Sequence, residues 1–326
     1  MNIDLKLKFN YRNTVFLFSA LTVLFGAIGI SYKAFGIVLI PLISSFLAIL
    51  FCVEKKKAAF IITSAILIVV EIISSVVTYY NVISLSSISL ALIIAICYLK
   101  GIKKSEGALY STIAIFLFGI LIASLYVMGK TNNYSFASVY DEFILAYDNY
   151  KLDVISRISE IPDNMKGNSD LFTPQYITLL FDAFLDCIIA FGVILSFLIV
   201  GVTYKIFTKL LHVYSKDTDK VLSFDFIPSK AFAYFYFIVA IISAFTAKDT
   251  GSLSISIMNL FLIFEIVFAY FGFKFVTTIF TLRKQKSGFT PIIILLLVLV
   301  FSSLAVQLLA IVGAFVCTKQ KIQNTN

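Results

Sequence analysis

The chain contains no tryptophan, a single histidine and few charged residues. Charged side chains make up 13% of its 326 residues, whereas hydrophobic ones make up 60%, and the mean hydropathy is +1.00. A soluble globular domain has about 25% charged residues and about 45–50% apolar ones. So little polar surface cannot cover a water-exposed fold. The composition therefore excludes an ordinary soluble protein and indicates that lipid is the solvent.

The scarcity of histidine and cysteine excludes several kinds of site. His212 is the only histidine, so a histidine-rich metal site cannot form. The four cysteines fall in apolar stretches without a C-x-x-C pair, which is typical of buried thiols. The motifs H-E-x-x-H, G-x-S-x-G and G-x-x-x-x-G-K-[ST] are absent. We therefore expect no metal, no cofactor and no enzymatic activity.

The net charge of +8 does not indicate nucleic-acid binding. Lysine and arginine form short clusters between apolar stretches rather than one continuous basic face, as the positive-inside rule produces. With the amino terminus in the cytoplasm, 18 of the 26 basic residues fall on the cytoplasmic side. We expect the first apolar stretch to be an uncleaved span. The sequence thus predicts a multi-pass protein of the bacterial plasma membrane with a cytoplasmic amino terminus.

Long apolar stretches dominate the chain. A transmembrane helix needs about 20 apolar residues. Nine stretches approach this length: 14–31, 34–53, 58–80, 82–99, 108–128, 176–204, 231–247, 253–280 and 290–317. The sequence predicts an all-α fold, a polytopic bundle of about nine spans. We expect a five-span amino-terminal half (1–128), an extracytoplasmic loop (129–175) and a four-span carboxy-terminal half (176–326).

The extracytoplasmic loop 129–175 has the pattern of a surface helix. Apolar residues recur every three or four positions from Val139 to Ile161, which predicts an amphipathic helix over about 136–161. Ser138 and Asp141 offer a capping box at its start. The polar face is acidic, whereas a helix attracted to anionic lipid would be basic. We interpret this helix as a lid over the outer mouth of the bundle, with a simple tether as the alternative.

Four carboxylates interrupt the apolar stretches: Glu71, Asp182, Asp186 and Glu265. Asp182 and Asp186 are four residues apart, so they share one face of a helix. With the outer boundary near Tyr176 and a rise of about 1.5 Å per residue, they lie about 9 and 15 Å deep. Glu71 and Glu265 also fall between the middle of the membrane and its outer boundary. A charge there costs about 2.5–3.5 kcal/mol on insertion scales.

No lysine or arginine lies at the depth of these acids. A bound cation, an amine-bearing ligand or a proton is therefore the expected partner of Asp182 and Asp186, with Glu265 assisting. The leading hypothesis is a protein for small-molecule or ion transport or binding, with a site between the third, sixth and eighth spans. Because no nucleotide motif exists, energy would come from an ion gradient or from separate ATPase subunits.

Each acid also has a structural interpretation. A single intramembrane carboxyl can hydrogen-bond to a neighbouring helix for packing alone. For Glu71, which has many serines nearby, we favour that interpretation. For the aspartate pair we favour ligand binding. For Glu265 the two interpretations are equally supported. Asn259 is interpreted as an interhelical hydrogen-bonding residue. The alternative function is therefore a structural or assembly protein of the membrane without a transported substrate.

The carboxy-terminal half carries a series of motifs over roughly 176–318. A long helix is followed by the stretch Phe224–Pro228, and a later span contains Asn259 and ends near Gly272 before a basic linker and a last span. This series resembles the YybS-like family of predicted membrane proteins of Gram-positive bacteria, whose function is not established. The general plan is similar to that of the substrate-binding S components of energy-coupling factor transporters. By analogy, the resemblance implies a small-molecule role.

Overall fold

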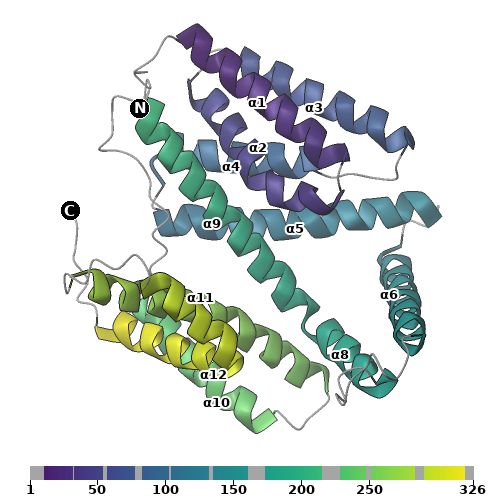
Figure 1. Cartoon of the computed structure of the whole chain (residues 1–326), viewed down its shortest axis with the longest axis vertical. Helices are drawn as coiled ribbons and strands as arrows, with labels where there is room; N and C mark the ends of the chain where they lie inside the picture. The colour runs from purple at the N-terminus through teal and green to yellow at the C-terminus, as the bar shows by residue number, and fades with distance from the viewer. Residues whose placement is uncertain are drawn as a thin grey trace. The chain divides into compact units, whose positions relative to one another are not determined.

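The computed structural model describes residues 11–31, 33–53, 57–77, 83–102, 104–131, 135–160, 173–214, 228–246, 251–282 and 290–319 (Figure 1). Every regular element in these ranges is an α-helix, which confirms the all-α prediction. The helices are α1 (Tyr11–Ser31), α2 (Lys33–Val53), α3 (Ala58–Val77), α4 (Ile83–Leu99), α5 (Lys104–Thr131), α6 (Phe136–Ser159), α8 (Pro174–Asp186), α9 (Ile188–Tyr214), α10 (Lys230–Thr246), α11 (Ser252–Leu282) and α12 (Thr290–Lys319).

Five of the described helices are long and apolar enough to cross a membrane. They contain the segments Arg12–Ser31, Gly36–Val53, Glu106–Gly129, Ile188–Val213 and Ser252–Ile279. Shorter apolar helical segments are Ala58–Ile73, Ile83–Leu99, Lys230–Thr246 and Leu304–Lys319. These segments follow the predicted apolar stretches. A membrane protein with several spans is therefore supported, while the total of about nine spans stays a prediction.

The chain folds into two compact units. The amino-terminal unit comprises residues 1–174 and 195–225, and the carboxy-terminal unit comprises residues 175–194 and 226–326. The helix α9 contributes to both units. The three segments predicted from the sequence stay a prediction. The compact units are a different description of the chain, because their boundary falls within α9.

The core of the amino-terminal unit is built from close-packed aliphatic side chains. Leu47 of α2 and Leu90 and Ile94 of α4 are fully buried. Phe207 of α9 packs edge-on against Tyr98, with 5.7 Å between the ring centroids. Lipid tails are as apolar as these side chains, so helix association in a membrane depends on close packing and on interhelical hydrogen bonds. We infer that this unit is stabilised chiefly by such packing.

The carboxy-terminal unit has an aromatic core and one very close helix contact. Tyr236 of α10 packs against Phe268 of α11, with 5.1 Å between the ring centroids. A Cβ atom at Gly272 would overlap the Leu309 carbonyl oxygen of α12, and one at Gly313 would overlap the Phe268 carbonyl oxygen. The backbones of α11 and α12 therefore touch where each helix contributes a glycine.

A helix predicted over about 136–161 is observed as α6, and its place outside the membrane stays a prediction. Its N-cap is Ser135, whose hydroxyl oxygen accepts the Ala137 N–H at 3.2 Å. The capping box predicted at Ser138 is not the observed cap, because the Ser138 hydroxyl donates to the Ser135 carbonyl oxygen at 2.7 Å. The first turn therefore begins three residues earlier than the capping pattern indicated. Ile161 lies outside the described residues.

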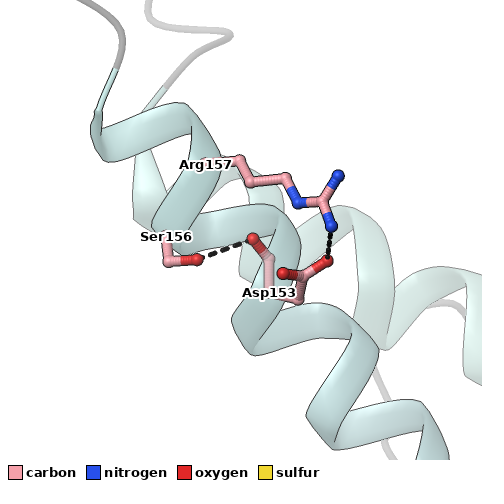
Figure 2. A network of polar contacts seen from close by, with 3 residues as sticks. All are labelled: Asp153, Ser156 and Arg157. Carbon is pink, nitrogen blue, oxygen red and sulfur yellow. Dashed lines mark hydrogen bonds and ion pairs between the residues drawn. The ribbon is translucent and has the colours of Figure 1, made fainter.

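The polar face of α6 carries a small network of contacts. Figure 2 shows the Arg157 guanidinium 2.9 Å from the Asp153 carboxylate, with the Ser156 hydroxyl donating to the Asp153 carbonyl oxygen at 2.8 Å. The predicted apolar stripe is covered only in part: Val139, Tyr147, Val154 and Ile158 are half-buried, whereas Phe143, Ala146 and Tyr150 are exposed. The amphipathic character of α6 follows the sequence pattern, while its role as a lid stays a prediction.

Candidate functional site

The stretch predicted as one span over 176–204 consists of two helices. The helix α8 ends at Asp186 and α9 begins at Ile188. Between them, the Cys187 N–H is shared between the carbonyl oxygens of Ala183 at 3.3 Å and Phe184 at 3.2 Å. The interruption thus falls directly after the second aspartate of the predicted pair.

The side chain of Asn259 in α11 bridges this interruption. In a continuous helix the Ala190 N–H would donate to the Asp186 carbonyl oxygen four residues earlier. Instead, the Ala190 N–H donates to Asn259 Oδ1 at 2.9 Å, and Asn259 Nδ2 donates to the Asp186 carbonyl oxygen at 2.5 Å. One carboxamide therefore replaces one backbone hydrogen bond and leaves both backbone groups paired. The interhelical role predicted for Asn259 is confirmed.

Asp182 and Asp186 both lie on an exposed face of α8. Ile177, on the opposite side of the helix, is buried. A residue nine positions further along an α-helix is turned by about 180°, which accounts for the opposite environments of Ile177 and Asp186. The aspartates therefore lie on the exposed face of α8, which they share with apolar side chains such as Leu179.

The depth predicted for Asp182 and Asp186 stays a prediction, but the helix boundaries bear on it. The helices α8 and α9 contain 13 and 27 residues. Together they would extend about 60 Å, twice the thickness of a hydrocarbon core of about 30 Å. The segment of α9 that can span a membrane, Ile188–Val213, begins after both aspartates. A span confined to α9 would leave both aspartates at its end, whereas a span that includes α8 would place them within it.

Glu265 lies elsewhere in the carboxy-terminal unit. It is six residues beyond Asn259 in α11, which corresponds to about 9 Å along the axis and about 120° around it. Its side chain is 7% exposed. Its Oε1 atom accepts no hydrogen bond from the described residues. The two residues of α11 therefore project from different faces of the helix.

Glu71 lies in the amino-terminal unit, where it contacts the start of α4. Its side chain is 6% exposed, and its Oε2 atom accepts the Ser84 N–H at 3.1 Å. The Ser84 hydroxyl donates to the carbonyl oxygen of Leu67 in α3 at 3.2 Å. The first N–H groups of a helix lack intrahelical acceptors and carry partial positive charge, so a carboxylate is favoured there. Glu71 thus fits the structural interpretation.

The structure assigns three of the predicted site residues to the carboxy-terminal unit and one to the other unit. Asp182 and Asp186 share a face of α8, Glu265 lies on α11, and Glu71 lies on α3. Among the residues that the structure describes, no three His, Cys, Asp or Glu side chains are grouped so that they could hold a metal ion. A common site for all four acids stays a prediction.

The connection between α5 and α9 has a charge opposite to that of the whole chain. Residues 129–186 contain nine of the 18 acidic residues but only four of the 26 basic ones, a net charge of −5 in a chain of +8. This connection contains α6 and α8 and joins two candidate spans. If both candidate spans cross the membrane and neither α6 nor α8 does, the acidic charge lies on one side of it, which stays a prediction.

These features define an all-helical membrane protein with several spans. The chain belongs to the DUF2232 family of predicted membrane proteins, whose family model matches residues 17–315. No curated protein and no solved structure matches the chain. The match confirms the predicted membrane character and extends over helices of both compact units.

Proposed function

We propose that the protein binds or transports a small cationic or amine-bearing ligand, which it meets at Asp182 and Asp186. The observation that carries this proposal is the acidic connection 129–186, which ends in two exposed aspartates beside an interrupted helix. Clustered carboxylates raise the local concentration of cations and speed their association. The same acids would repel an anionic substrate.

The local geometry of α8 also favours a cation. Asp186 is the last residue of this helix. Its carbonyl oxygen is already paired with Asn259, so the attraction for a cation would come from the carboxylates. Asp182 lies one turn earlier on the same face, and the two carboxylates would share the ligand.

The proposal extends to the membrane arrangement. It includes about nine spans, a cytoplasmic amino terminus and a place in the bacterial plasma membrane, supported by the bias of 18 of the 26 basic residues toward the cytoplasmic side. The acidic helix α6 would cover the outer mouth as a lid. The YybS-like resemblance and the plan of the S components support a small-molecule role, with energy from an ion gradient or separate ATPase subunits.

Binding of labelled cations by the full chain in lipid nanodiscs tests this proposal. The probes are ²²Na⁺, ¹⁴C-methylammonium and ¹⁴C-spermidine, which differ in charge and size. We expect the wild type to bind at least one probe and the double variant Asp182→Asn/Asp186→Asn to bind it at least tenfold more weakly. Glu106→Gln, at an exposed acid in the first turn of α5, is the matched control. Equal binding by the double variant and the wild type would overturn the proposal.

A structural role in the membrane is the second candidate. Glu71 favours it, because its carboxylate is engaged by the backbone at the start of α4. A wild-type protein that binds none of the three probes would support this second function. The buried acids would then serve helix packing alone.

A further inference from the structure

We propose that the junction between α8 and α9 is a hinge and that Asn259 is the positioning residue that sets its angle. The motivating geometry is the insertion of the Asn259 carboxamide between the Asp186 carbonyl oxygen and the Ala190 N–H. A side chain inserted into the hydrogen-bond ladder is a recognised cause of helix kinks. The link between this hinge and ligand binding rests on the proposed function, whereas the hinge itself does not.

The hinge has two arrangements in which the backbone groups of the junction are paired. With Asn259 inserted, its amide satisfies both Asp186 and Ala190. With Asn259 withdrawn, the Ala190 N–H can donate directly to the Asp186 carbonyl oxygen and restore a continuous helix. Neither arrangement leaves these two backbone groups unpaired, so passage from one to the other does not require a permanent loss of backbone hydrogen bonds.

An asparagine suits this position for a chemical reason. The inserted group must donate to a carbonyl oxygen and accept from an N–H, and a carboxamide does both. An ionised aspartate would keep the acceptor but place a second oxygen against the Asp186 carbonyl, and a leucine would offer neither group. Asn259 is only 5% exposed, so water has little access to take over its bonds.

A hydrogen bond within α11 orients the Asn259 side chain toward the junction. Asn259 Nδ2 also donates to the Ile255 carbonyl oxygen at 2.9 Å, one turn earlier in α11. The carboxamide is thereby oriented by α11 while its other contacts go to α8 and α9. Because Asp182 and Asp186 both belong to α8, a change at the hinge moves both carboxylates together relative to α9.

A distance measurement across the junction tests the hinge. Nitroxide labels are attached through p-acetylphenylalanine at the positions of Leu179 in α8 and Leu198 in α9, which are 67% and 52% exposed. This chemistry leaves the four native cysteines unlabelled. Nineteen residues of straight helix would separate the two Cα atoms by about 28 Å. Double electron–electron resonance on the full chain in nanodiscs then reports whether the junction is bent or straight.

The expected result is a wild-type distribution with a component shorter than the straight-helix distance. Asn259→Leu should shift the distribution toward about 28 Å, because only the continuous helix then pairs the backbone. Asn259→Asp keeps the acceptor for Ala190 and should shift the distribution in part. Ser256→Ala is the matched control, since this exposed serine of α11 donates only to Ser252 in its own helix.

Wild-type distributions in both Asn259 variants would overturn the hinge. If Asn259→Leu does not elute as a folded monodisperse protein, Asn259→Asp decides the question by the same criterion. The binding assay and the distance measurement together distinguish the hinge from the proposed function. Distances that respond to Asn259 without binding of any probe would retain the hinge and reject the proposed function. Probe binding by a protein whose distances are the same in the wild type and in both Asn259 variants would retain the function and reject the hinge.

Discussion

The two compact units bring their helices together in different ways. In the amino-terminal unit, a Cβ atom at Gly26 would overlap only the side-chain end of Leu67, and one at Gly36 would overlap the end of Ile83 and lie 3.1 Å from the Gly29 carbonyl oxygen. In the carboxy-terminal unit, a Cβ atom at Gly272 or Gly313 would meet backbone atoms of the neighbouring helix. A side chain can rotate away from an added methyl group, whereas a backbone cannot. The comparison indicates that the carboxy-terminal unit depends far more on its glycines.

The largest expected effect is that of Gly272→Ala. The new Cβ atom would overlap the Leu309 carbonyl oxygen, so α11 and α12 must separate along their contact. Overpacking of this kind costs about 1–3 kcal/mol and can cost more where the backbone itself must move. We expect a loss of about 3 kcal/mol in the free energy of unfolding, measured by titration of mixed micelles with sodium dodecyl sulfate.

Two alanine variants in the amino-terminal unit test whether its glycines tolerate a Cβ atom better. At Gly119 in α5, a Cβ atom meets nothing within 4 Å, and alanine is favoured over glycine in a helix by about 1 kcal/mol. Gly119→Ala should therefore be neutral or slightly stabilising. Gly26→Ala should fall between the two, because Leu67 can adjust. Equal losses at Gly26 and Gly272 would contradict the proposed difference between the units.

The units also differ in the surroundings of the one buried glutamate that each contains. Glu71 and Glu265 are almost equally buried, at 6% and 7% exposure. Glu71 accepts a backbone N–H at the start of α4, whereas Glu265 directly follows Phe264, a residue of the aromatic core. Two glutamates with the same burial therefore have different surroundings, so burial and residue type alone do not define the role of an acid.

The second largest effect is expected for Glu71→Leu. Removal of the carboxylate leaves the Ser84 N–H without this acceptor in an apolar setting, which costs about 1–3 kcal/mol. We expect a loss of about 2 kcal/mol in the free energy of unfolding in the same titration. Glu71→Gln keeps a carbonyl oxygen for Ser84 and should lose less than about 1 kcal/mol. A Gln variant as unstable as the Leu variant would show that charge, rather than hydrogen bonding, is what matters.

Glu265→Leu should have the opposite sign. Its Oε1 atom accepts no hydrogen bond from the described residues, and replacement of a poorly paired buried polar group by an apolar one is often neutral or stabilising. We expect a gain of about 1 kcal/mol or no change. A loss as large as that of Glu71→Leu would remove the contrast between the two glutamates.

The apolar helices were predictable because runs of about 20 apolar residues carry their own signal. The interruption after Asp186 was not predictable locally, because residues 183–191 contain neither proline nor glycine. The interruption lies where Asn259, about 70 residues away in the sequence, contacts the chain. Asn259 replaces the hydrogen bond that the Ala190 N–H would otherwise donate to the Asp186 carbonyl oxygen. The sequence did not predict the close contact of α11 and α12 for a similar reason, since Gly272 and Gly313 come from separate helices. A lone polar residue or glycine in an apolar run is the signal that points to such contacts.

The smallest effect is expected on α6, which belongs to the amino-terminal unit but lies outside its aliphatic core. Arg157 and Asp153 form an i, i+4 pair at 2.9 Å, and both side chains are exposed (Figure 2). Exposed pairs of this kind contribute about 0.3–0.5 kcal/mol, because water and salt screen them. Arg157→Ala should therefore change the free energy of unfolding by less than about 0.5 kcal/mol, and the change should vanish at 1 M NaCl. A change comparable to that of Glu71→Leu would mean that α6 contributes to the stability of its unit as much as the buried helices do.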